Sequence, residues 1–140
     1  MSLQIFDLHN EATSRLGRTF AAITTNTNSD GAIIDTVGYE SLEFYLASGT
    51  ITDGTYTAQI FHGNDPALAD GVQLTGEEVL GSAVFTPTAD SNETRRIGYV
   101  GKKRYVRLRI VSTGVTTGGT IGAIAVLGSP LHGPAAASVS

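Results

Sequence analysis

The sequence contains no cysteine and no tryptophan, and few of its side chains are charged. Without cysteine there are no disulfide bonds, no thiolate metal ligands and no cysteine nucleophile. Charged residues make up 16% of the chain, against about 25% in an average soluble domain. Such a poorly charged surface is typical of a subunit that covers part of itself with partner molecules.

Long apolar runs are missing as well. No stretch of about 18 consecutive apolar residues occurs, so we expect no membrane-spanning helix. The opening residues MSLQIFDLHN have neither the basic region nor the apolar core of a secretory signal, and none is expected. A chain of 140 residues is long enough to form one domain around a hydrophobic core.

Alternation of apolar and polar residues dominates the sequence and predicts half-buried β-strands. The alternation is clearest in three segments: 41–48, 55–62 and 104–111. In the third, Val106, Leu108 and Ile110 are predicted to share one face. Weaker strands are expected in four more segments: 19–25, 32–37, 79–85 and 120–127. The last of these is apolar on both faces, as in a central or interface strand.

Turns separate these strands, among them Asn28–Gly31 and the hairpin loop 49–54. The pattern predicts an all-β fold, an antiparallel, jelly-roll-like β-sandwich of about seven or eight strands with short helical turns and extended terminal arms. Two helical turns are expected, at 11–16 and at 65–71, the second capped by Asp65. The predicted division is an amino-terminal arm, a sandwich domain and a carboxy-terminal tail: 1–18, 19–128 and 129–140.

Charge is distributed unevenly along the chain. The segment between Thr19 and Thr94 holds eleven acidic residues and no lysine or arginine, and seven of the nine basic residues lie within 95–109. Two interpretations remain open. Either Arg107 or Arg109 pairs with Glu43 across the sheet, or the basic strand docks on an acidic partner or another copy of the chain. The net charge of −4 argues against nucleic-acid binding.

No catalytic motif is found, and the chain is not expected to be an enzyme. His9, His62 and His132 lack the spacing of a zinc site, and no nucleophile elbow or phosphate-binding loop occurs. Carboxylates in loops are the ligands that calcium prefers, although no ladder of alternating aspartates supports such a site. The loop carboxylates considered are Asp53, Asp65, Asp70, Glu77 and Glu78. We therefore predict no catalytic residue, no cofactor and no metal.

A carbohydrate-binding module is one function that suits a β-sandwich. Sugars stack on flat aromatic side chains, which in this sequence would be Tyr39 and Tyr56. Because tryptophan is absent and the tyrosines are scattered over separate strands, a core or interface role is the stronger expectation for both.

Three segments, 35–65, 97–111 and 123–134, resemble a group of small structural proteins of tailed bacteriophages. The likeness rests on strands and turns, including Gly38-Tyr39, the Gly98–Gly101 turn, the 103–109 strand and the Gly128–Pro130 exit. None of these is a catalytic position. The resemblance implies a β-sandwich that decorates or cements the outside of the phage head. A neck or tail subunit, of the connector or tail-tube type, is the alternative.

The resemblance also implies partners and a location. The expected partners are the major capsid protein and copies of the same chain, in a trimer or another cyclic cluster, on the capsid surface after assembly in the host cytoplasm. Neither nucleic acid nor a membrane is expected as a partner. The candidate contact residues lie near both chain ends and in the basic strand: Ile5, Phe6, Leu8, Lys103, Arg107, Arg109, Pro130, Leu131 and His132.

Overall fold

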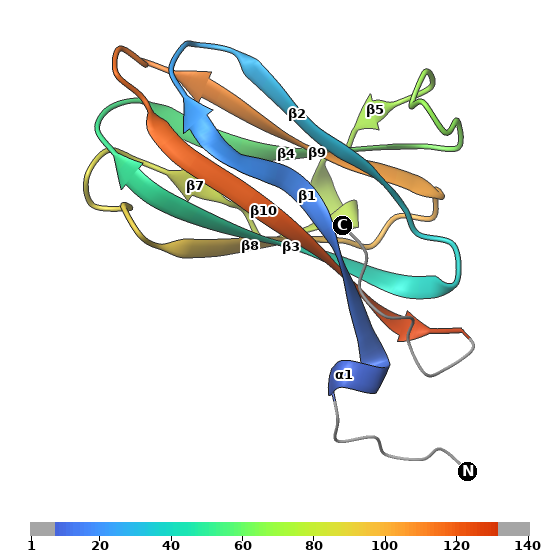
Figure 1. Cartoon of the computed structure of the whole chain (residues 1–140). Helices are drawn as coiled ribbons and strands as arrows, with labels where there is room; N and C mark the ends of the chain where they lie inside the picture. The colour runs from blue at the N-terminus through green and yellow to red at the C-terminus, as the bar shows by residue number, and fades with distance from the viewer. Residues whose placement is uncertain (1–7, 132–140) are drawn as a thin grey trace.

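The computed structural model describes residues 8–131, which form two antiparallel β-sheets (Figure 1). Sheet A contains, in spatial order, β1 (Ala12–Ile23), β10 (Gly119–Pro130), β3 (Tyr39–Ile51), β8 (Thr94–Tyr99) and β6 (Val79–Leu80). Sheet B contains β2 (Asn28–Asp35), β9 (Tyr105–Thr113), β4 (Thr55–Gly63) and β5 (Val72–Gln73), and β7 (Val84–Phe85) also pairs with β4. The predicted all-β sandwich is confirmed.

The strand pairs are nested along the chain. β1 pairs with β10, β2 with β9, β3 with β8 and β4 with β5. The first four strands also alternate between the two sheets. Nested pairs that alternate between two facing sheets form a jelly roll. Six of the seven longer strands lie largely where the sequence predicts them, but β8 was not predicted. Gly98 and Tyr99, expected in a turn, belong to β8 and pair with β3. The larger strand number comes from β8 and from β5, β6 and β7, each of two residues.

The hydrophobic core fills the space between the sheets. The inward residues of β10 are Ile121, Ala123, Ala125 and Leu127, all fully buried. From β9, the predicted inward set Val106, Leu108 and Ile110 is confirmed. Strand β10 is central in sheet A, as its apolar sequence predicts, because β1 and β3 pair with its two edges.

Strands β1 and β2 approach each other where the edges of the two sheets meet. A Cβ added to Gly31 would overlap the backbone carbonyl of Gly17, so this approach requires glycine. Register shifts flank both glycines, between Leu16 and Arg18 in β1 and between Asp30 and Ile33 in β2. β-Bulges of this kind bend a strand and cover a sheet edge that would otherwise stay open.

The predicted amino-terminal boundary is wrong. Residues 12–18, expected in an arm, belong to β1, and the helical turn predicted at 11–16 is replaced by α1 (Leu8–Glu11) followed by strand. Backbone pairing with β10 makes this segment a strand although its own alternation is weak, since Thr13 pairs with Leu127 and Leu16 with Ile124. At the other end β10 extends two residues past the expected limit of 128.

Two internal expectations also need correction. The residues predicted as a turn at Asn28–Gly31 pair with β9 and open strand β2. The strand predicted at 79–85 divides, because β6 joins sheet A and β7 joins sheet B. In the first case pairing with β9 overrides the local preference of polar residues and glycine for a turn. In the second case Gly81, with a positive φ of 78°, interrupts the predicted strand, and the two halves pair with different sheets.

The segment 65–71 forms two successive turns in place of the predicted helical turn. The Leu68 N–H donates to the Asp65 carbonyl, and the Gly71 N–H donates to the Leu68 carbonyl. Asp65 caps the first turn as expected, because its Oδ2 accepts from the N–H groups of Ala67 and Ala69. A positive φ of 55° at Leu68 ends the turn. In the described part of the chain, no helix has the length and hydrophobicity to cross a membrane.

Candidate functional site

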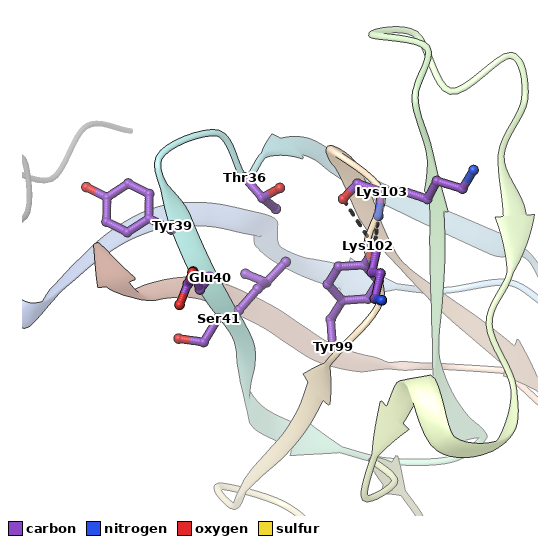
Figure 2. A pocket seen from close by; sticks show the side chains of 9 residues that line it. Thr36, Tyr39, Glu40, Ser41, Tyr99, Lys102 and Lys103 are labelled. Atoms are coloured by element: carbon purple, nitrogen blue, oxygen red, sulfur yellow. Dashed lines mark hydrogen bonds between the residues drawn. The ribbon is translucent and has the colours of Figure 1, made fainter. Parts of the chain in front are cut away.

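A shallow pocket of about 290 Å³ opens at the end of the sandwich where β3 begins and β8 ends (Figure 2). Figure 2 shows Tyr39 on one side and the Lys102–Lys103 loop on the other, with Tyr99 beside that loop. The lining mixes cations, a carboxylate and hydroxyl groups, so it favours no single class of ligand. Its residues are Thr36, Tyr39, Glu40, Ser41, Leu42, Tyr99, Gly101, Lys102 and Lys103.

Tyr99 and His62 form a buried polar pair next to this pocket. The Tyr99 hydroxyl lies 2.9 Å from His62 Nδ1 and accepts a hydrogen bond from the Lys103 N–H at 2.8 Å. Burial lowers the pKa of His62 and raises that of Tyr99, so both side chains are neutral at pH 7. The pair therefore fixes the β8–β9 loop (100–104) on the end of sheet B.

Three of the five loop carboxylates considered as calcium ligands, Asp53, Asp65 and Asp70, bind backbone groups of the chain itself. Asp53 accepts hydrogen bonds from the N–H groups of Thr116, Thr117 and Gly118, which lowers its pKa. Asp70 accepts from residues 64 and 65 in the same way. Within residues 8–131, no group of three histidine, aspartate or glutamate side chains is placed to hold a metal. The three aspartates stabilise loops.

The predicted pairing of Arg107 or Arg109 with Glu43 is wrong. Glu43 lies in sheet A, whereas both arginines lie on the outer face of sheet B, where their partner is Asp30 of β2. Arg109 Nε donates to Asp30 Oδ1 at 2.5 Å, and Arg107 lies 3.8 Å from the same carboxylate. The hydrogen bond from Arg109 lowers the pKa of Asp30. The two arginines do pair within the chain, as one of the two interpretations predicted, but with Asp30 and not with Glu43.

The two sugar-binding candidates differ. Tyr56 is fully buried in the core, so it cannot stack on a sugar. Tyr39 is half-buried and lines the pocket of Figure 2. A single aromatic wall of this kind is weak support for a carbohydrate-binding module.

Exposed apolar side chains gather at the end of the sandwich that carries the pocket. We call this the apolar end and define it by four residues from four segments: Leu8, Val37, Val100 and Leu131. Leu8 is 77% exposed and Leu131 is 54% exposed. The loops at the opposite end, 24–27, 52–54, 86–93 and 114–118, contain no large exposed apolar side chain.

The apolar end includes part of the predicted contact set. Leu8, Pro130 and Leu131 lie there, and Lys103 borders the neighbouring pocket. Arg107 and Arg109 lie elsewhere, on the outer face of sheet B. Ile5, Phe6 and His132 fall outside the described residues. Sequence reasoning missed Val37 and Val100, because a single valine in a loop carries no pattern.

A second apolar surface lies on the outer face of sheet A. Ile124 of β10 pairs with Leu16 of β1 on one side and with Tyr45 of β3 on the other, and all three are exposed. Of this surface, the sequence indicated only the β10 part, through the apolar residues on both faces of that strand.

Comparison with known proteins identifies no relative: no protein-family model matches the chain, and no curated protein matches it significantly.

Proposed function

We propose that this chain is a non-enzymatic structural protein of a tailed-phage virion, a decoration or cement protein that binds the outside of the head. The sequence resemblance supports the class, and a jelly-roll sandwich is compatible with it. Since such folds serve many functions, the fold alone does not select this one. The observation that carries the proposal is the apolar end.

The apolar end is suited to contact with another protein. Leu8, Val37, Val100 and Leu131 come from four segments that the fold brings to one end. The Leu131 N–H donates to the Gly38 carbonyl at 2.8 Å, which ties the last described residue to the β2–β3 loop (36–38). Burying one such side chain completely contributes about 1.5–3 kcal/mol, so four that are at least half exposed give enough for a modest contact after the cost of association.

A modest contact is sufficient for a protein that binds a shell at many equivalent sites. A ligand that binds only the assembled state stabilises that state by its own binding free energy. Repetition over the shell multiplies this effect without requiring tight individual sites. The chain would therefore bind assembled heads and bind free capsid subunits weakly.

The test replaces the two most terminal residues of the apolar end, in the double variant Leu8→Ser, Leu131→Ser. Heads of the encoding phage, freed of decoration proteins, are incubated with this variant and with the unchanged chain, and bound protein is measured by gel densitometry. We expect about tenfold weaker binding by the double variant, because two apolar contacts are lost. The matched control is Val84→Ser, Val111→Ser, which removes two partly exposed valines of sheet B, away from the apolar end, and should bind normally.

Equal occupancy by both double variants would refute the role of the apolar end. Failure of the unchanged chain to bind heads or any other part of the particle would refute the proposed function. Binding to isolated tails or necks, with no binding to heads, would identify the chain as a neck or tail subunit and not as a head protein.

A further inference from the structure

The outer face of sheet A is apolar across three neighbouring strands. Residues directly opposite each other in antiparallel strands point to the same side, so Leu16, Ile124 and Tyr45 form a continuous row. Their exposed fractions are 38%, 41% and 44%. Val126 continues the surface along β10, opposite Ser14.

Phe20 extends this surface through a close contact with glycine. A Cβ at Gly122 would overlap the Phe20 ring, so the ring lies directly against the backbone of β10. Phe20 is nevertheless 48% exposed. We call the whole surface the outer apolar face and define it by five residues: Leu16, Phe20, Tyr45, Ile124 and Val126.

The corresponding face of sheet B carries charged and polar residues between its apolar ones. Its cross-strand pairs include Asp30 with Arg109, Gln59 with Arg109 and Thr57 with Val111. A face of an antiparallel sheet that meets water normally carries polar residues, as this one does. The outer apolar face departs from that rule, which indicates that another molecule covers it.

The charges beside the outer apolar face favour a neutral, self-complementary partner. Glu43 pairs with Val126 and Arg96 pairs with Tyr45, so the β3–β8 side of the face carries one charge of each sign. A strongly charged partner would call for a border of one sign. Two copies of this face, by contrast, can place Glu43 of one copy near Arg96 of the other.

The area is also sufficient for a pair of identical chains. The three strands β1, β10 and β3 have 12 to 13 residues each, and at about 3.4 Å per residue and about 4.8 Å between strands they cover about 600 Å². Two such faces bury about 1,200 Å², the lower end of the range for specific protein interfaces. We therefore expect a specific dimer of moderate affinity.

We propose that a second copy of this chain packs on the outer apolar face, with a two-fold axis in the interface that passes over Ile124. Two sheets packed face to face are a stable arrangement in β-sandwiches, and the same packing is available here between chains. In a two-fold interface each residue near the axis meets itself, so the two Ile124 side chains are in contact. This inference does not rest on the proposed function, because it concerns the isolated chain.

The experiment uses sedimentation equilibrium of the purified chain at about 10–300 µM, a range that resolves a dissociation constant in the micromolar range. We expect the unchanged chain to form dimers. Ile124→Glu and Ile124→Lys should each be monomeric, because each variant brings two like charges together. An equimolar mixture of the two should dimerise again, because opposite charges then meet at the axis.

The matched control is Val111→Glu, which places the same charge on the outer face of sheet B, on its own central strand β9. This variant should dimerise like the unchanged chain. Circular dichroism and thermal unfolding verify that all variants are folded.

The inference is overturned if the unchanged chain stays monomeric over the whole range. It is equally overturned if folded Ile124→Glu still dimerises, or if the mixture of the two folded Ile124 variants stays monomeric. Head binding in the test above can fail or succeed independently of these results, so the two proposals are separable.

Discussion

The outer faces of the two sheets differ in how they are covered. On sheet B the chain covers itself: the Arg109 guanidinium lies 4.3 Å from the centre of the Phe61 ring and bonds to Asp30. On sheet A, Phe20, Tyr45 and Ile124 remain partly exposed. The two outer faces therefore differ in the pairing of their charges and not in the number of charged residues. Asp30 binds Arg109 and lies near Arg107 on sheet B, whereas an exposed apolar surface remains on sheet A.

The largest effect is expected on sheet B, from Asp30→Ala. This change leaves Arg109 and Arg107 next to each other without their shared carboxylate, and Arg107 Nε already lies buried without a hydrogen-bond partner. Partial exposure of Asp30 reduces the cost, and we expect the free energy of unfolding to fall by about 1–2 kcal/mol in urea denaturation at pH 7. Dimer formation should be unchanged. An unaltered urea midpoint would show that sheet B does not depend on this carboxylate.

The pH dependence of stability should have opposite signs on the two sheets. The Arg109 hydrogen bond lowers the pKa of Asp30 below its ordinary 3.8, so its stabilising contribution is present above that value and is lost as the pH falls through the lowered pKa. Burial raises the pKa of Glu43 above its ordinary 4.5, so its contribution is present below that value and is lost as the pH rises through the raised pKa.

Two isosteric variants measure these opposite signs in urea denaturation between pH 3 and pH 7. The stability advantage of the unchanged chain over Asp30→Asn should be larger at pH 6 than at pH 3. Glu43→Gln should gain stability relative to the unchanged chain over the same rise in pH. The same sign of change in both variants would contradict the electrostatic contrast between the sheets.

The smallest effect on folding is expected from Phe20→Ala on sheet A. The ring is half exposed and rests on Gly122, so its loss should change the free energy of unfolding of the monomer by less than about 1 kcal/mol. The dimer dissociation constant should nevertheless rise about tenfold, since aromatic residues contribute strongly at interfaces. Unfolding is measured on dilute samples, in which the chain is monomeric, and dimerisation is measured by sedimentation of concentrated samples. A large loss of monomer stability would show that Phe20 mainly stabilises the fold and not the dimer interface.

Much of the fold was predictable because alternation depends on neighbours in the chain. The strand at 104–111 and its buried set are found where the sequence places them. Prediction was wrong where pairing with a distant strand decides the structure: Asn28–Gly31 resembles a turn and forms the start of β2. That error also hid Asp30 as the partner of Arg109.

The candidate surfaces were less predictable than the fold. Leu8 and Leu131 were expected as contacts and lie at the apolar end, but Val37 and Val100 join them only through the fold. Tyr45 belongs to an alternating strand, and nothing in its own segment reveals that Ile124 and Leu16 lie beside it.

The sequence by itself determined that the chain forms a β-sandwich and which side chains fill the core, because a pleated strand turns successive residues to opposite faces and water drives the apolar face inward. Only the tertiary structure decided which strands are neighbours. It brought Asp30 to Arg109 and set Phe20 and Ile124 on one outer face. The physical reason is that strand order results from packing between segments far apart in the chain, which no local pattern records.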